Sequence, residues 1–289
     1  MGDVVYLNGR YVPRDEAVVS VYDGGFLHGA GLFETMRAGN RRIFRLDAHL
    51  ERLMRSAEKL LFPVDRAQLP STDDFQSLLA RNDLSSARVR LTVTSGSVLI
   101  TADADRPSLT VCATATGDPD YPPEFHKNGV AVMISPFRQI ATDPLAGHKT
   151  TNYLSRLVAL RAAHAKSCVE AIWFTPENLL AEGSVSNVFV MKGGTVATPP
   201  LDTPVLPGIA RAVVIELCRT ASIPVEERPV SINDLLDADE VFLTNSVMQV
   251  MPVIRVEAKD IGEGKPGRIA TELLTAYRAL VAWECRNDG

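Results

Sequence analysis

The segment Gly117-Asp118-Pro119-Asp120-Tyr121-Pro122-Pro123 is the clearest break in the sequence. Each proline fixes its own φ, lacks an N–H donor and restrains the residue before it, so regular structure is not expected to run through the segment. A chain of 289 residues is long enough for two domains of ordinary size. We therefore predict an N-terminal domain over residues 1–117, a linker over 118–124 and a C-terminal domain over 125–289.

Before this break, the hydrophobic pattern has two periods. Apolar and polar residues alternate over 87–94, which predicts a half-buried strand, and residues 4–7 followed by Asn8-Gly9 predict a hairpin. From Leu46 onward the apolar residues recur at helical spacing, with Asp47 as a candidate N-cap.

After the break, the pattern again mixes helices and strands. Strands and helices that intermix in both halves predict an α/β or α+β protein of two domains. The expected elements are helices over 154–165, 208–221 and 269–283, strands over 171–175 and 240–243, a hairpin of 187–191 with 195–198, and a short helix capped by Ser231.

The composition is that of an ordinary globular protein. Apolar residues make up 46% of the chain and charged residues 22%, which excludes a disordered chain, because such a chain cannot bury enough apolar surface. The 30 basic and 35 acidic residues give a net charge of −5, so the chain lacks the basic surface that nucleic-acid binding requires.

The sequence contains no sign of a membrane or secretory destination. Its start is charged throughout, and no stretch approaches about 20 uninterrupted apolar residues. We expect a cytoplasmic protein with neither membrane nor nucleic-acid partners. Buried reduced thiols are favoured over disulfides or a zinc site, since the four cysteines lie far apart: Cys112, Cys168, Cys218 and Cys285.

Glycine and histidine motifs predict neither a nucleotide loop nor a metal site. The glycines at 24, 25, 29 and 31 lack the spacing of the nucleotide-binding motifs, so we interpret them as places where backbone passes close to something bulky, a ligand included. The five histidines lack metal-ligand spacing, and neither H-E-x-x-H nor G-x-S-x-G occurs. No metal is expected.

Four further sequence features each have a common structural explanation when they are considered one at a time. Residues 207–211 open a helix whose first N–H groups suit a phosphate, and polar groups follow a strand at 243–246. Lys149 is by default a surface lysine, because a lysine becomes a nucleophile only where its surroundings lower its pKa. Glu182 lies in a polar run between two apolar strands and is by default solvated.

Together and in this order, these features resemble the fold-type IV enzymes that use pyridoxal 5'-phosphate. That family comprises branched-chain aminotransferases, D-amino-acid aminotransferases and 4-amino-4-deoxychorismate lyases. Each motif is modest, but six in the family's order are highly specific, and they span nearly the whole chain. They are 23–35 (DGGFLHGAGLFET), 49–53 (HLERL), 148–154 (HKTTNYL), 181–189 (AEGSVSNVF), 206–211 (LPGIAR) and 242–246 (FLTNS).

The resemblance implies a two-domain fold with a smaller N-terminal α/β domain and a larger C-terminal domain around a barrel-like core. It implies pyridoxal 5'-phosphate as cofactor and a homodimer in which the glycine-rich N-terminal segment lies near the active site. Arg52 precedes the break and the other implied cofactor contacts follow it, so the site is expected between the domains.

The resemblance also implies roles for single residues. Lys149 would hold the cofactor as a Schiff base and move the proton of the substrate's α-carbon. Glu182 would pair with the pyridine nitrogen and favour its protonated form. Tyr153 would hydrogen-bond near the cofactor, although branched-chain enzymes carry one more residue between the lysine and this tyrosine. The phosphate would be held by Arg52, the N–H groups of Ile209 and Ala210, and Ser246, and the candidate substrate contacts are Thr35 and Asn245.

The favoured reaction is transfer of an amino group between a branched-chain-like amino acid and a 2-oxo acid. Aminotransferases dominate the family, and Tyr153 resembles theirs. The alternative is a 4-amino-4-deoxychorismate lyase that releases pyruvate and 4-aminobenzoate, because 245–247 and 248–253 resemble the lyases. The arginine and histidine typical of D-amino-acid aminotransferases are absent at 95–98. Three arginines that would suit a substrate carboxylate are expected to point to water instead: Arg88, Arg90 and Arg138.

A cofactor or metabolite binder that kept the fold without catalysis is a third hypothesis. Such a protein has no need of a Schiff-base lysine or of a carboxylate for the pyridine nitrogen. The presence of both Lys149 and Glu182 disfavours it.

Overall fold

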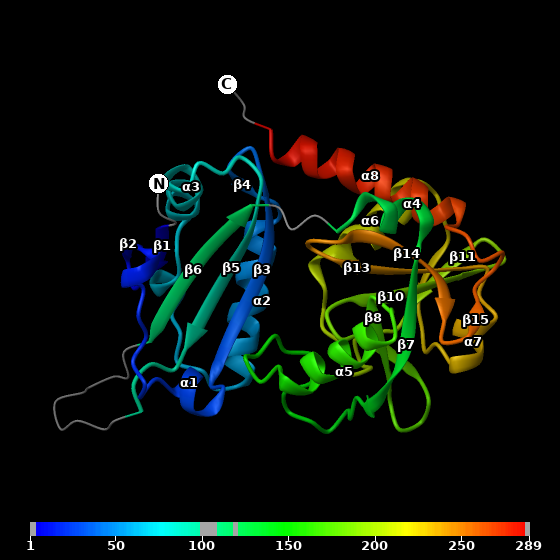
Figure 1. The fold of residues 1–289 in the computed structure, drawn as a ribbon, viewed down its shortest axis with the longest axis horizontal. Helices are drawn as coiled ribbons and strands as arrows, with labels where there is room; N and C mark the ends of the chain where they lie inside the picture. The colour runs from blue at the N-terminus through cyan, green and yellow to red at the C-terminus, as the bar shows by residue number, and fades with distance from the viewer. Residues whose placement is uncertain (1–3, 99–108, 118–120, 287–289) are drawn as a thin grey trace. The chain divides into compact units, whose positions relative to one another are not determined.

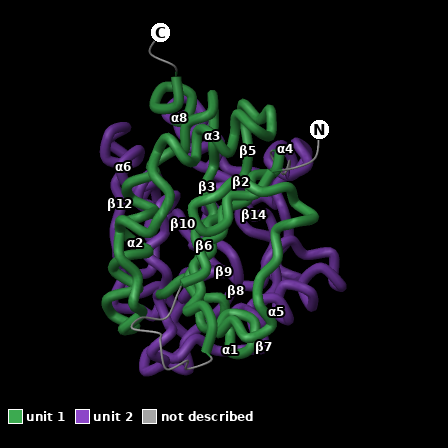
Figure 2. The backbone as a smooth tube through the Cα atoms, turned by 90° about the vertical axis from the view of Figure 1, so that its left-hand side faces the viewer, with its two compact units in different colours: residues 1–119, 148–152, 281–289 green, residues 120–147, 153–280 purple. Residues whose placement is uncertain are grey.

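Two compact units make up the chain in the computed structural model, which describes residues 4–98, 109–117 and 121–286 (Figure 2). Lys149 belongs to the first unit, although it follows the break near residue 117, whereas Tyr153 belongs to the second. The first unit combines residues 1–119, 148–152 and 281–289, and the second combines 120–147 and 153–280.

Six of the described strands form the sheet of the first unit, in the order β2-β1-β6-β5-β3-β4 (Figure 1). Neighbouring strands are antiparallel. The predicted hairpin and the predicted strand over 87–94 are confirmed, and alternate side chains of that strand are buried. The strands are β1 (Val4–Leu7), β2 (Arg10–Pro13), β3 (Gly31–Gly39), β4 (Arg42–Ile43), β5 (Ala87–Thr94) and β6 (Thr110–Gly117).

One face of this sheet packs against two helices, α2 (Leu46–Lys59) and α3 (Thr72–Arg81). Burial of apolar side chains between sheet and helices is the dominant favourable term for the unit. Short 3₁₀ turns at Arg14–Glu16 and Arg66–Gln68 complete it. The shared core includes Leu50 and Leu53 of α2, Phe75 and Leu78 of α3, Met36 of β3 and Leu91 of β5.

The start of α2 differs from the prediction. The helix is confirmed, but Asp47 as its N-cap is wrong, because the N-cap is Arg45 in the left-handed conformation at φ 55°. Asp47 lies inside the first turn instead, where its carboxylate is attracted to the positive end of the helix dipole.

The glycine-rich segment forms a short helix, α1 (Gly24–His28), followed by β3. Gly29 ends this helix at φ 66°, which glycine adopts without strain. A Cβ on Gly31 would lie 2.9 Å from the Val93 carbonyl oxygen. The glycines therefore mark close approaches of backbone, as predicted, and the bulky neighbours found here are other parts of the chain.

In the described part of the second unit, nine strands form one mixed sheet in the order β12-β11-β10-β13-β14-β7-β8-β9, with β15 beside β14. The pairs β11–β12, β14–β7 and β7–β8 are parallel. The sheet curls into a half-barrel, so that β9 returns to β10. In the turn between them, the Gly183 N–H at the end of β9 donates to the carbonyl of Ser186, the residue before β10, at 2.7 Å. The strands are β7 (Val130–Arg138), β8 (Glu170–Phe174), β9 (Leu180–Gly183), β10 (Asn187–Lys192), β11 (Thr195–Thr198), β12 (Val225–Glu227), β13 (Glu240–Asn245), β14 (Gln249–Val256) and β15 (Lys259–Asp260).

Apolar side chains cover both faces of this sheet. On one face Ala159 and Ala163 of α5 pack against Ala171 and Trp173 of β8. The opposite face carries a larger core from β7, β8, β10, β13 and β14. The helices are α4 (Pro123–Asn128), α5 (Leu154–Ala165), α6 (Ile209–Thr220), α7 (Ile232–Leu236) and α8 (Arg268–Glu284).

The predicted elements of the second half are found close to their expected bounds. Helices α5, α6 and α8 and the hairpin of β10 with β11 are confirmed, and Ser231 caps α7. Residues 118–120 of the predicted linker lie outside the described residues, and Pro123 already begins α4. Within the described ranges, no helix is long and apolar enough to cross a membrane.

Candidate active site

In the first unit, Lys149 is held beside the start of β3. The Phe33 N–H donates to the Lys149 carbonyl at 2.9 Å, and the Thr151 N–H donates to the Gly31 carbonyl at 2.8 Å. These bonds run residues 148–152 antiparallel to β3. They place Lys149 Nζ 4.6 Å from the centre of the Phe33 ring. Phe33 is only 4% exposed. The ammonium group therefore contacts an aromatic face.

Gly29 fastens the same segment from the other side. Its carbonyl accepts hydrogen bonds from Thr151 Oγ1 at 2.5 Å and from Asn152 Nδ2 at 3.0 Å. A Cβ at position 29 would lie 2.7 Å from Asn152 Oδ1. The glycine-rich segment thus positions the backbone that carries Lys149.

Arg52, a predicted phosphate contact, is clamped by Glu34 of β3. Arg52 Nε and Nη2 donate to the two oxygens of Glu34 at 2.8 and 2.5 Å, and His49 Nδ1 lies 2.8 Å from Glu34 Oε2. All three side chains are buried. Burial alone would raise the pKa of Glu34, but Arg52 and His49 outweigh it and lower the pKa to about 2. Because Nε and Nη2 bind different oxygens of Glu34, the guanidinium group of Arg52 is fixed in a bidentate ion pair.

The same cluster acts on His49. Burial lowers the pKa of His49, and the charges of Arg52 and Lys149 lower it further, against the opposing effect of Glu34. The imidazole is therefore neutral at pH 7.

The opposite face of the sheet carries Phe33 and Thr35, because side chains alternate along β3 and Glu34 faces α2. Thr35, a predicted substrate contact, lies directly across from Arg90 in the sheet register. The Arg90 guanidinium carbon lies 3.8 Å from the centre of the Phe33 ring, so Arg90 stacks on the ring that Lys149 also contacts. Arg88, Arg90 and Arg138 are all exposed, as expected.

In the second unit, Glu182 lies in β9 and is only 2% exposed. It is therefore not the solvated carboxylate of a loop that its local sequence alone would indicate. Its Oε1 accepts a hydrogen bond from Arg156 Nη2 at 2.5 Å, and its Oε2 accepts one from the Leu206 N–H at 2.9 Å. A cation and a backbone donor therefore fix the orientation of this carboxylate.

The turn after Glu182 is held by Tyr153 and by a second buried carboxylate, Glu170. The Tyr153 hydroxyl donates to the Ser184 carbonyl at 2.9 Å. Glu170 accepts hydrogen bonds from the N–H groups of Ser184 and Val185 at 3.0 and 3.1 Å and from Ser186 Oγ at 2.8 Å. Burial raises the pKa of Glu170 despite these donors.

The remaining predicted contacts lie at two neighbouring points of the second unit. Ile209 and Ala210 begin α6 behind Gly208, which has no side chain to cap the helix. Gly208 packs so closely on Asn187 that a Cβ would overlap the amide. First-turn N–H groups in this position suit an anion.

Asn245 and Ser246 follow at the end of β13. Asn245 Oδ1 accepts hydrogen bonds from the N–H groups of Val247 and Met248 at 2.8 and 2.7 Å, and its Nδ2 donates to the Val185 carbonyl at 3.1 Å. The side chain thus joins the turn after β13 to the turn after β9. Ser246 is partly exposed in the same turn. Substrate contact by Asn245 stays a prediction.

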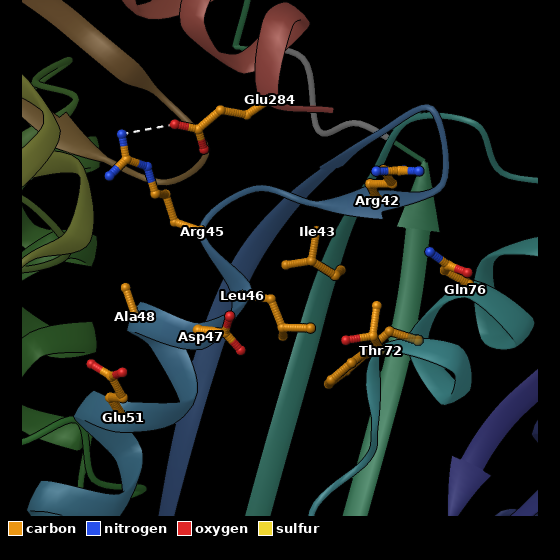
Figure 3. A pocket seen from close by; sticks show the side chains of 11 residues that line it. Arg42, Ile43, Arg45, Leu46, Asp47, Ala48, Glu51, Thr72, Gln76 and Glu284 are labelled. Atoms are coloured by element: carbon orange, nitrogen blue, oxygen red, sulfur yellow. Dashed lines mark ion pairs between the residues drawn. The ribbon is translucent and has the colours of Figure 1, made fainter. Parts of the chain in front are cut away.

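A pocket of about 530 Å³ lies elsewhere in the first unit, around the starts of α2 and α3. Two of its lining residues, Arg45 and Glu284, form an ion pair, which Figure 3 shows. Its atoms Arg45 Nη2 and Glu284 Oε1 lie 2.8 Å apart. The residues that we predict for the site are not among the described residues that line this pocket. Its lining includes Arg42, Asp47, Glu51, Thr72 and Gln76.

Five residues of these clusters escaped the sequence prediction: Phe33, Glu34, His49, Arg156 and Glu170. A signal existed for Glu34, which shares the apolar face of β3 with Leu32 and Met36 and therefore needs a buried partner. Arg156 and Glu170 carry no comparable signal, because their partners come from distant strands.

A model of the family described as amino-transferase class IV matches residues 31–256, which is most of the chain. The chain belongs to this family. Its class IV relatives include an aminodeoxychorismate lyase of Bacillus subtilis, 32% identical over 95% of this chain and 94% of that protein. A D-alanine aminotransferase of Bacillus licheniformis is 32% identical over 97% and 98%.

A solved class IV structure has the same fold. It is the T.th. branched-chain amino acid aminotransferase with pyridoxamine 5'-phosphate, which superposes with a TM-score of 0.89 at 26% identity over 100% of this chain and 96% of that chain. The architecture is therefore fold type IV, as predicted. Class IV enzymes use pyridoxal 5'-phosphate, and this class IV protein is an aminotransferase or a lyase of the same family.

The Glu34 cluster predicts an acid-sensitive fold. The pKa of Glu34 lies at about 2 in the folded protein against an ordinary 4.5, so its stabilisation is present above about pH 4.5 and is lost as the pH falls towards 2. Glu34 should contribute about 3 kcal/mol to the fall in unfolding free energy across this window. Urea denaturation of wild type and Glu34→Gln between pH 2 and 7 measures it.

Glu34→Gln should be less stable at pH 7 and should show a flatter pH dependence. Glu51→Gln, which changes an exposed carboxylate of the same helix as Arg52, is the control and should keep the wild-type slope. Equal slopes for Glu34→Gln and wild type would refute the assignment.

Proposed function

We propose that this chain is a pyridoxal-5'-phosphate-dependent aminotransferase that moves an amino group between a branched-chain-like amino acid and a 2-oxo acid. The observation that carries the proposal is the pairing of residues 148–152 with β3, which fixes Lys149 Nζ 4.6 Å from the Phe33 ring centre. A lysine that must act on a planar cofactor needs such a fixed place beside apolar surface.

The residues present fit the cofactor's chemistry. A phosphate group calls for N–H donors and a guanidinium, which the uncapped start of α6 and the clamped Arg52 provide. A protonated ring nitrogen calls for an anion shielded from water, which Glu182 provides. When bound, pyridoxal 5'-phosphate supplies a conjugated ring that accepts electrons as a bond at the substrate's α-carbon breaks.

In this proposal each group has one task. Lys149 Nζ holds the cofactor and then carries a proton to and from the substrate's α-carbon. Glu182 keeps a proton at the ring nitrogen, and Tyr153 orients the same region through its hydroxyl. The phosphate is anchored by Arg52, the N–H groups of Ile209 and Ala210, and Ser246.

The lyase is the second candidate, and Asn245 favours it. The Asn-Ser pair at 245–246 resembles the lyases, and the Asn245 side chain organises the two turns beside it through three hydrogen bonds. An aminodeoxychorismate lyase is among the relatives at 32% identity. The two reactions differ in whether the proton returns to the cofactor or pyruvate leaves the substrate.

We also propose a homodimer. The first unit exposes apolar side chains in the segment before and within α1, with Val18 75% and Phe26 73% exposed and Val21 and Tyr22 between them. An apolar segment of this kind is typical of a protein interface.

Borohydride reduction with pyridoxal 5'-phosphate should attach the cofactor covalently to Lys149, as intact-mass and peptide mass spectrometry would show. Lys149→Ala should lose both the attachment and at least about 100-fold of turnover. Lys166→Ala, at an exposed lysine, should behave as wild type. Equal labelling of Lys149→Ala would disprove the assignment.

A substrate panel should separate the two reactions. With a branched-chain L-amino acid alone, the absorbance of the bound cofactor should change to that of its pyridoxamine form, because the amino group stays on the cofactor. D-alanine and aminodeoxychorismate complete the panel, with pyruvate measured in each case. Pyruvate release from aminodeoxychorismate, with no amino acid producing the pyridoxamine form, would reject the aminotransferase in favour of the lyase.

Sedimentation velocity should give the mass of two chains at micromolar concentration. Replacing Phe26 by Asp places a charge in the exposed apolar segment and should shift the protein towards monomer. A wild-type monomer at these concentrations contradicts the dimer.

A further inference from the structure

The carboxylate of Glu182 is held at both oxygens. Oε1 accepts from Arg156 Nη2 at 2.5 Å, and Oε2 accepts from the Leu206 N–H at 2.9 Å. The Glu182 side chain is 3% exposed and the Arg156 side chain 18%. This ion pair is therefore screened only weakly by water.

Arg156 is itself fixed. It lies in the first turn of α5, where its Nη1 donates to the carbonyls of Gly183 and Ser184 at 3.2 and 3.3 Å. Its guanidinium carbon lies 5.6 Å from the centre of a Trp173 ring. The side chain thus grips both Glu182 and the turn that follows it, and cannot turn away without losing several contacts.

The charge of Arg156 is permanent. Burial lowers the pKa of Arg156, but Glu182, Tyr153 and Glu170 more than offset this and raise it above its ordinary value. These three groups, on β9, just before α5 and on β8, are the ones whose charges act on the guanidinium. Glu182 therefore always has a cation beside it.

We propose that Arg156 is a positioning residue that aims Glu182 at the cofactor's ring nitrogen and weakens the hold of Glu182 on a proton there. This inference rests on the proposed function, in which Glu182 faces that nitrogen. Each carboxylate oxygen has two acceptor sites, so both can still accept a further donor. The guanidinium shares the negative charge of Glu182 and repels a second cation nearby, so the ring nitrogen gives up its proton more easily than it would beside Glu182 alone.

The test is a pH titration of the holoenzyme with cofactor labelled with ¹⁵N in the ring, followed by the ¹⁵N chemical shift. Arg156→Gln removes the cation and keeps a donor, and should raise the midpoint of ring-nitrogen deprotonation by about one pH unit. Arg156→Met, similar in volume, should raise it as well. Glu182→Gln should lower it, and Arg161→Gln, at an exposed arginine of the same helix, should leave it unchanged.

A merely structural Arg156 would alter stability without moving this midpoint in either direction. Circular dichroism shows which of the two Arg156 variants is folded. If the midpoint of ring-nitrogen deprotonation is unchanged or lowered in a folded variant, while Glu182→Gln still lowers it, the inference is overturned. Failure of the wild type to bind the labelled cofactor, or a Glu182→Gln midpoint equal to wild type, instead refutes the assigned roles of cofactor and Glu182.

Discussion

Carboxylates shut away from water impose the main constraint on this fold. An unpaired buried carboxylate costs several kcal/mol, so each must be met by donors in fixed places. Glu34 ties β3 to α2 through Arg52 and His49, and Glu182 ties β9 to α5 and to the chain before α6. Glu170 ties β8 to the turn after β9. Arg52 and Glu182, two of the groups that we assign to the cofactor, are thus placed by pairings that also hold each unit together.

Periodicity and turn signals in the sequence were sufficient for many of the described helices and strands. Residues 87–94 and 154–165 lie in elements that bury one face, and burial of one face leaves a readable pattern. The start of α2 was not predictable in this way, because it depends on the left-handed φ of Arg45 and not on a capping side chain. Neither α1 nor β3 was predicted, since glycines interrupt the hydrophobic pattern there.

In the candidate site, too, some residues could be predicted from the sequence and others could not. Lys149 and Glu182 stood out only through the order of motifs along the chain, because each looks like an ordinary surface residue in its local sequence. In the structure, Lys149 instead contacts an aromatic ring and Glu182 is buried. Arg156 was out of reach, because its partner Glu182 follows 26 residues later on a strand whose packing against α5 has no local signature.

The grip of Glu170 on the turn after β9 acts mainly through main-chain N–H groups, which every residue except proline possesses. The shape of this turn is therefore largely independent of the side chain at Val185. Evolution can exchange that side chain, and with it the surface beside Tyr153 and Asn245, while the backbone stays in place. A turn built in this way keeps its backbone shape when the side chain at Val185 is exchanged for any residue other than proline.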